Sequence, residues 1–396
     1  DPTFTANAAV PGDFVGFPTA PGELIRFFTT VRQLSETTTL QTNVVGEFST
    51  GSIEHTLLAG VDLYWRDFEQ SGLQGNPQVP FFNIFDPVYG VPRPDSFDGS
   101  LIPTNTSYSE FYGIYVQDQI QLLENLHVLA GLRYDTTFDE VRLLTAGTTS
   151  EVEESAFSPR LGVVYQPIEP LSLYGSYSRS FVPNSGITAT GDALEPERGT
   201  QFEVGARAEL LQGALVANVA LFNITKSNVA TSDPNQLPGS GFSVLTGEQR
   251  SQGIELDVIG EILPGWNIVA NYAYTDADIT EDNGGLEGNR LFGVPEHNVN
   301  LWTNYEIQDG NLAGLGFGLG VNYISERFGD NENSFVLEDY FLTNAAISYR
   351  RDNWQAGLNF RNLFDVDYID SSEGLRFGEN RPGEGLTIIG SFSMEF

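Results

Sequence analysis

Strand-like segments recur along the sequence with a regular rhythm, and few folds are compatible with it. Each segment is near or above the roughly 9 to 11 residues that a tilted β-strand needs to cross a bilayer. Apolar residues at helical spacing are not sustained anywhere. The sequence therefore predicts an all-β chain, with strands at residues 36–49, 53–69, 109–123, 125–141, 155–167, 170–181, 199–211, 213–226, 249–262, 265–278, 296–308, 313–327, 339–350, 353–364 and 385–396.

The connections between these segments alternate between short and long. The short ones are 50–52, 168–170, 212–213, 264–265 and 351–353. The long ones, which are rich in Gly, Asn, Asp and Pro, are 70–108, 182–198, 227–248, 279–295 and 365–384. Outer-membrane barrels have short turns on one side and long loops on the other. A soluble β-sandwich does not sort its loops in this way, so the pattern predicts an antiparallel transmembrane β-barrel.

Alternation within the strands supports this fold. In the last segment one face is mostly apolar, with Leu386, Ile388, Gly390, Phe392, Met394 and Phe396, whereas the opposite face is mostly polar, with Thr387, Ile389, Ser391, Ser393 and Glu395. The first face suits lipid and the second suits a wet lumen. No stretch approaches the roughly 18 to 20 apolar residues of a transmembrane helix, so a helical membrane protein is excluded.

The formal net charge of −34 excludes a nucleic-acid-binding role, because binding to phosphates requires a basic surface. Acidic disordered chains lack aromatic residues, whereas this chain contains 28 Phe, 16 Tyr and 4 Trp. It contains no cysteine, so disulfides and thiolate chemistry are excluded for this sequence. The composition fits a folded protein exposed to an oxidising compartment.

Several motifs occur in a fixed order from about residue 35 onward, and the chain resembles the C-terminal part of TonB-dependent siderophore receptors of the ferrichrome-iron type. The motifs are GSIEHTLLAGVD at 51–62, YGIYVQDQ at 112–119, GLRYD at 131–135, SPRLG at 158–162, LEPERG at 194–199, SQGIEL at 251–256, VPEH at 294–297, NLFD at 362–365 and the terminal Phe396. Each motif is weak alone, and the order carries the resemblance.

The resemblance implies a 22-stranded barrel that encloses an N-terminal plug domain. It implies import of a ferric siderophore of the hydroxamate, ferrichrome-like class, energised through TonB, in the outer membrane of a Gram-negative-type bacterium. The Fe(III) complex would be cargo, and no resident cofactor is expected. Expected partners are the siderophore, the TonB complex through the plug, and outer-membrane lipid and lipopolysaccharide.

The chain is expected to contain about strands 8 to 22 of such a barrel, without the plug. It begins with Asp1 and its single methionine is Met394, which suggests a start within a longer precursor. Residues 1–35 are expected to form an extracellular loop or a partial strand, and residues 36–396 the barrel wall. An open or poorly closed sheet, with unpaired backbone groups on 36–49 or on 385–396, and a lipid-facing Phe396 that closes the last strand are also expected.

Two other functions are compatible with the pattern. One is a passive porin-like diffusion channel, and the other is a TonB-dependent receptor for a different chelate such as cobalamin. A plug sequence upstream would distinguish a receptor from a porin.

The aromatic segment 80–90 is the candidate ligand contact, because an exposed loop rarely carries many aromatic rings without a use. Aromatic rings hold a bulky, partly apolar chelate with little loss of conformational entropy. Packing of the loop on the barrel rim is an equally good interpretation. The candidate ligand-binding residues are Phe81, Phe82, Phe85 and Tyr89, with Tyr64 and Phe377.

Catalytic and metal-binding residues are not expected. His55, His127 and His297 lack the paired spacing of a metal site, and no nucleophile is evident beside them. The acidic segment 276–283 lacks the Gly and Glu of a calcium-binding loop, so a solvated loop is favoured. Arg133, Arg160 and Asp135 are expected to form charge pairs in the lumen.

Overall fold

The structure is a computed structural model that describes residues 23–24, 29–75, 82–83, 85–90, 99–144, 147–184, 188–190, 192–236, 242–372, 374 and 380–396. Nearly all regular structure in these ranges is β-strand. The exception is the short 3₁₀ helix η1 (Leu211–Gly213), which lies in a turn. No helix within the described ranges has the length and apolar character needed to span a membrane.

Within the residues that the structure describes, fifteen strands form one sheet whose strand order follows the sequence, as the sequence predicts. The strand pairings of this sheet from β7 to β21 are antiparallel. The strands of the sheet are β2 (Thr29–Thr50), β3 (Ile53–Gly75), β5 (Gly99–Leu123), β6 (Leu126–Leu143), β7 (Thr148–Ile168), β8 (Leu171–Val182), β9 (Glu197–Leu210), β10 (Leu215–Ser232), β11 (Ser243–Leu263), β12 (Trp266–Glu281), β13 (His297–Glu306), β14 (Leu315–Ile324), β17 (Tyr340–Arg351), β18 (Trp354–Arg361) and β21 (Thr387–Met394).

Outside the large sheet, the described part of the chain forms three small two-stranded sheets. Two of them belong to long connections of the chain: β15 (Arg327–Phe328) pairs with β16 (Val336–Leu337), and β19 (Ile369–Ser371) pairs with β20 (Arg381–Pro382). In the third, β1 (Glu23–Leu24) pairs with β4 (Phe82–Asn83). The long connections therefore carry structure of their own.

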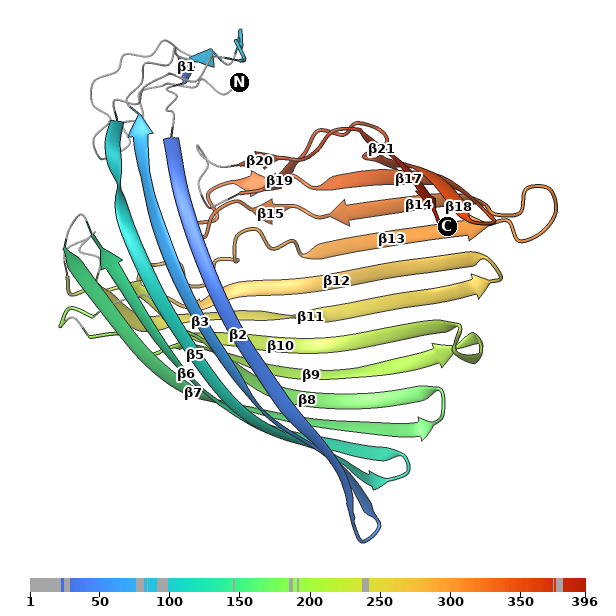
Figure 1. Cartoon of the computed structure of the whole chain (residues 1–396), viewed down its shortest axis with the longest axis horizontal. Helices are drawn as coiled ribbons and strands as arrows, with labels where there is room; N and C mark the ends of the chain where they lie inside the picture. The colour runs from blue at the N-terminus through green and yellow to red at the C-terminus, as the bar shows by residue number, and fades with distance from the viewer. Residues whose placement is uncertain are drawn as a thin grey trace. The chain divides into compact units, whose positions relative to one another are not determined.

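The chain divides into two compact units. Unit 1 comprises residues 1–41, 62–112 and 136–153, and unit 2 comprises residues 42–61, 113–135 and 154–396. In unit 2, strands β8 to β14 run side by side and are joined by tight turns at one end (Figure 1).

Glycine at a left-handed position shapes one of these turns. Gly265, between β11 and β12, has φ +78°. Its N–H donates to the Glu261 carboxylate at 2.7 Å, and its carbonyl oxygen accepts from the Glu306 N–H at 2.9 Å. A Cβ at this position would lie 2.5 Å from the Glu306 carbonyl oxygen. Only glycine provides both the backbone conformation and the space.

The sheet has almost no apolar interior of its own. Apolar side chains that are buried within the described residues are few: Ala156, Leu194, Ala277, Ile279 and Leu337. In contrast, Val44, Phe202 and Phe392 are 72%, 57% and 69% exposed. An apolar face of this extent on a sheet is typical of a wall that contacts lipid.

The alternation expected from the sequence is present in β6. Leu132 and Tyr134 are exposed on one face, whereas Asp135, on the other face, is 2% exposed and accepts a hydrogen bond from Arg133 Nε at 2.7 Å. The expected Arg133–Asp135 pair is therefore confirmed. Arg160 packs differently: its side chain lies over Gly131, with its Cγ 2.8 Å from the position that a Cβ on Gly131 would occupy.

The two ends of the strand order are β2 and β21, and each has one neighbouring strand, β3 and β18. Residues 36–49 and 385–396 are all described, and no backbone ladder joins them. This agrees with the expectation of a sheet that is open between these two segments. The last strand is shorter than expected, because β21 ends at Met394.

Phe396 therefore lies two residues beyond the last strand, with a fully exposed side chain. The residue before it is held by Asn353, whose Nδ2 donates to the Glu395 carbonyl oxygen at 2.8 Å. The expectation that Phe396 is part of the last strand is wrong. The cause is the tight turn at Asp352 (φ +49°), after which the β18–β21 pairing starts at Trp354 opposite Met394.

Candidate ligand-binding site

A cavity of about 760 Å³ lies in unit 2, at the end of β17, β18 and β21 that carries the long 362–386 connection. Its wall combines aromatic rings, amides and charged groups from strands and from the connection. The polar and aromatic residues that line it are Trp302, Asn344, Asn359, Arg361, Asn362, Tyr368, Asp370 and Glu384. The volume lies within the range of roughly 300 to 1,000 Å³ that is usual for small-molecule sites.

Trp302 of β13 supplies flat apolar surface to this wall. The neighbouring strand β14 has glycine at both positions beneath the indole, Gly318 and Gly320. A Cβ there would lie 2.5 Å from Cζ2 and 2.6 Å from Cε3 of the ring. The glycines therefore create the space in which the indole lies against the β14 backbone.

A row of asparagine side chains, the asparagine ladder, leads to the cavity across β13, β14 and β17. Its members are Asn298, Asn300, Asn322, Asn344 and Asn362. Asn344 Nδ2 donates to Asn322 Oδ1 at 2.7 Å, Asn322 Nδ2 donates to Asn300 Oδ1 at 2.5 Å, and Asn300 Nδ2 donates to Asn298 Oδ1 at 2.8 Å. All amides point the same way, so successive bonds polarise one another.

Asn362 ends the ladder and is 3% exposed. Its backbone N–H donates to Asn344 Oδ1 at 3.0 Å, and its Oδ1 accepts from the Val366 N–H at 2.8 Å. Its Nδ2 donates to the carbonyl oxygens of Val366 at 2.8 Å and Glu384 at 3.0 Å. Asn362 has φ +48°, a conformation that asparagine tolerates better than most residues. This one amide thus joins two parts of the connection, the first arm (residues 366–370) and the second arm (residues 382–386).

Tyr368 comes from the first arm and lies against Tyr340, with ring centroids 4.4 Å apart. Burial raises the pKa of the Tyr368 phenol, and the negative charge of Asp370 raises it further. The phenol is therefore neutral at physiological pH and available as a hydrogen-bond donor to a ligand.

The long connections of unit 2 are tied to one another. Arg327, which is 5% exposed, donates from Nη2 to the carbonyl oxygens of Ile369 at 2.9 Å and Asp370 at 2.6 Å. Ser372 Oγ donates to the Gly329 carbonyl oxygen at 2.9 Å. These bonds join the 325–339 connection to residues 369–372, beside the cavity.

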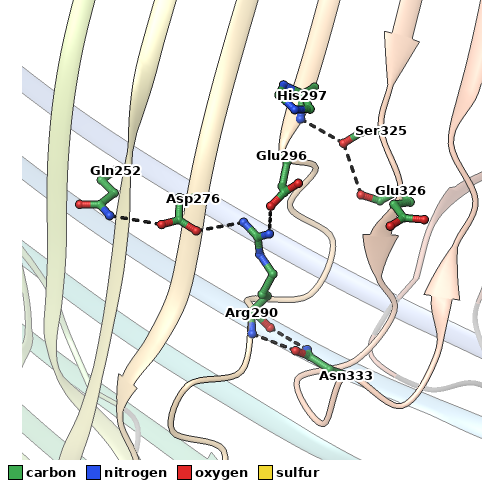
Figure 2. Close-up of polar contacts among 8 residues, drawn as sticks. All are labelled: Gln252, Asp276, Arg290, Glu296, His297, Ser325, Glu326 and Asn333. Atoms are coloured by element: carbon green, nitrogen blue, oxygen red, sulfur yellow. Dashed lines mark hydrogen bonds and ion pairs between the residues drawn. The ribbon is translucent and has the colours of Figure 1, made fainter.

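A second tie joins the connection before β13 to the 325–339 connection (Figure 2). The Arg290 guanidinium lies between two carboxylates, with Nη2 3.0 Å from Asp276 Oδ1 and Nη1 bonded to Glu296. The backbone N–H of Arg290 donates to Asn333 Oδ1, and Asn333 Nδ2 donates back to the Arg290 carbonyl oxygen, both at 2.9 Å. Gln252 donates to Asp276 at 3.2 Å.

The acidic segment 276–283 uses its carboxylates within the chain. Asp276 binds Arg290, and Asp282 Oδ2 accepts from the backbone N–H groups of Gly284 at 2.6 Å and Leu286 at 2.9 Å. No group of three candidate metal ligands is found in the part of the chain that the structure describes. The expectation of a solvated loop is wrong for most of this segment, because residues 276–281 belong to strand β12 and only residues 282–283 lie in the loop that follows it.

His55 stands beside a hydroxyl group, which the sequence did not indicate. Its Nδ1 lies 2.7 Å from Asp118 Oδ2, its Nε2 lies 2.8 Å from Thr50 Oγ1, and its ring stacks on Phe48. The expectation that no nucleophile lies beside a histidine is therefore wrong. The reason is that the tight turn after Thr50 brings the end of β2 back onto the start of β3.

The aromatic residues chosen from the sequence do not lie in the cavity as far as the structure describes them. Phe81 and Phe377 fall outside the described residues, and Phe82 is described only as part of β4. Phe85 and Tyr89 are each 77% exposed, and Tyr64 is half-buried in β3. Their contact with a ligand stays a prediction.

A family model described as TonB dependent receptor-like, beta-barrel matches residues 3–363, and the chain belongs to this family. The family is one of outer-membrane proteins, which fixes the location of the chain.

Individual proteins of this family are similar to the chain over most of its length. The metal-pseudopaline receptor of Pseudomonas aeruginosa is 34% identical over 342 residues, which cover 84% of this chain and 48% of that protein. The ferrichrome outer membrane transporter/phage receptor of Escherichia coli is 34% identical over 346 residues, 84% of this chain and 45% of that protein. The crystal structure of the siderophore receptor PiuA from Acinetobacter baumannii has a TM-score of 0.79 at 24% identity, over 94% of this chain and 57% of that one. The chain spans about half the length of the curated relatives it matches.

Proposed function

We propose that this chain forms barrel wall of a receptor that takes up a ferric siderophore across the outer membrane, with energy supplied through TonB. The family match carries the proposal, together with a ligand-sized cavity at the end of the strands where the long connections gather. The relatives named above are receptors or transporters of metal chelates by their names.

The cargo that fits best is a neutral or weakly charged chelate of the hydroxamate class. The chain has 53 Asp and Glu against 19 Lys and Arg, so it offers little basic surface for a strongly anionic complex. Aromatic rings and amides line the cavity, and such groups hold a bulky neutral ligand through contact area and hydrogen bonds. Fe(III) enters as part of the cargo.

The wall binds and orients the chelate and performs no covalent chemistry. TonB would act through a plug domain, and the exposed apolar face would contact outer-membrane lipid and lipopolysaccharide. The Thr50–His55–Asp118 arrangement is assigned a structural role, because Thr50 is an exposed residue where β2 ends and its bond to His55 closes the turn. The protein is accordingly proposed to be a transporter and not an enzyme.

Uptake of radioactive iron by cells tests the proposal. The complete protein would be produced in a strain without other hydroxamate receptors, with and without TonB. We expect saturable uptake of a ferric trihydroxamate that disappears in the strain without TonB. Uptake that persists without TonB and rises linearly with concentration would support a porin-like channel instead, and competition by cobalamin would indicate a different cargo.

A further inference from the structure

The asparagine ladder is not needed for the pairing of the strands, and its effect is expected on the walls of the cavity. The strands β13, β14 and β17 are already paired through their backbones, from Asn298 opposite Ile324 to Leu315 opposite Tyr349. Side-chain bonds between neighbouring amides are not required for this pairing. Their consequence is found at the end of the ladder, at Asn362.

Asn362 holds two segments that are far apart in the sequence. Its amide binds Val366 in the first arm, residues 366–370, and Glu384 in the second arm, residues 382–386. Tyr368 and Asp370 in the first arm and Glu384 in the second line the cavity. A displacement of the Asn362 amide would therefore move both arms together.

The orientation of Asn362 is fixed in turn by Asn344. The Asn344 Oδ1 accepts the Asn362 backbone N–H at 3.0 Å while its Nδ2 donates to Asn322 at 2.7 Å. Because an amide oxygen only accepts and an amide nitrogen only donates, these two bonds allow one orientation of the Asn344 amide, with its oxygen toward Asn362 and its nitrogen toward Asn322. The amide of Asn322 is oriented in the same way, because its oxygen accepts from Asn344 and its nitrogen donates to Asn300.

We propose that the asparagine ladder is a positioning device for the ligand: through Asn344 and Asn362 it fixes both arms of the 362–386 connection as walls of the cavity. Asn344 and Asn362 are positioning residues, and the effect on ligand affinity rests on the proposed function. The effect on the arms does not, so the two parts can be tested separately.

The arms are tested by spin labelling, which does not depend on any ligand. This chain contains no cysteine, so a nitroxide at Asp367→Cys, an exposed position in the first arm, reports the mobility of that arm alone. We expect the label to become more mobile when Asn344→Leu is added. Asn344→Asp keeps an oxygen acceptor for the Asn362 N–H and is expected to restore the immobile spectrum. Asn304→Leu, on the same face of β13 but outside the ladder, is the control. An unchanged spectrum in Asn344→Leu, or equal release in all three variants, would overturn the proposal.

Affinity is tested by uptake in the complete protein at matched outer-membrane amounts. We expect Asn344→Leu to raise the half-saturating concentration of a ferric trihydroxamate about tenfold with the maximal rate unchanged, the value of roughly one net hydrogen bond. Asn322→Leu, one step further from Asn362, should have a smaller effect, and Asn304→Leu none. An equal loss of maximal rate in all variants would contradict positioning. Absence of uptake by the unaltered protein would refute the proposed function and leave the spin-label result standing.

Discussion

The Arg290 guanidinium forms ion pairs with two carboxylates that belong to different parts of the chain, and its positive charge offsets their negative charges. Asp276 is in β12 and Glu296 lies just before β13, and all three side chains are partly exposed. A partly exposed ion pair contributes little free energy, about 0–1 kcal/mol. Its effect is therefore expected in the local order of the connection and not in the stability of the whole sheet.

We predict that Arg290→Met accelerates amide hydrogen exchange in residues 282–296 at least several-fold, because it leaves Asp276 and Glu296 close together without a cation between them. Exchange in β11 should stay the same. Hydrogen exchange measured by mass spectrometry on the purified protein checks this. Arg142→Met is the matched control, since Arg142 pairs with Glu140 at an exposed site. Equal acceleration in β11 would contradict a local role.

The residues that build the cavity could not be chosen from the sequence because their proximity depends on register. Asn300 and Asn322 are directly opposite each other in β13 and β14, although they are separated by a turn. A shift of one residue would turn either side chain to the other face. The NLFD motif at 362–365 marked the position of Asn362 through resemblance, but nothing in the motif indicated its four hydrogen bonds.

The ends of the strands were predicted well from the sequence where a tight turn between neighbouring residues determines them. At the short turns the expected ends lie within a few residues of the observed ones, because left-handed residues such as Gly51 (φ +71°) and Asp352 (φ +49°) fix them. At the long connections several strands extend further than expected. β5 begins at Gly99 and not at 109, and β11 begins at Ser243 and not at 249. In these extensions the apolar alternation fades while backbone pairing continues, so the pattern underestimates strand length.

At the level of two adjacent strands, packing of Trp302 on β14 gives a sharp prediction. Gly318→Val should displace the indole and destabilise the protein by about 1–3 kcal/mol, the usual cost of overpacking. The expected readout is a lower unfolding temperature in detergent together with red-shifted tryptophan fluorescence. Gly390→Ala is the control, because its added Cβ would meet Leu358 Cδ2 at an ordinary 3.7 Å. If both variants lowered the unfolding temperature equally, displacement of the Trp302 indole would not be the cause of the destabilisation.

At the scale of the whole molecule, the excess of acidic residues is repeated in the cavity. Two carboxylates, Asp370 and Glu384, and one guanidinium, Arg361, line it, so the formal charge of the lining is negative. Replacing both carboxylates by amides makes the lining positive. We predict that Asp370→Asn with Glu384→Gln improves binding of an anionic ferric catecholate about two- to fivefold relative to a neutral hydroxamate, a change in keeping with exposed charges.

Competition binding with the two chelates at low and high salt measures this preference. Arg361→Gln is the reciprocal variant and should shift the preference in the opposite direction. Because exposed charges are screened by salt, the preference should weaken at high ionic strength. A preference that is the same in all variants would show that the charge of the lining does not select the cargo.

The scarcity of buried apolar side chains has a consequence for how this protein is held together. A soluble domain collapses around its own interior, whereas here rings such as Phe202 and Phe392 find their apolar surroundings outside the chain. The acyl chains of the bilayer occupy the place that a hydrophobic core has in other folds. Insertion into the bilayer is therefore expected to complete the burial of these apolar faces, which would otherwise stay in contact with water.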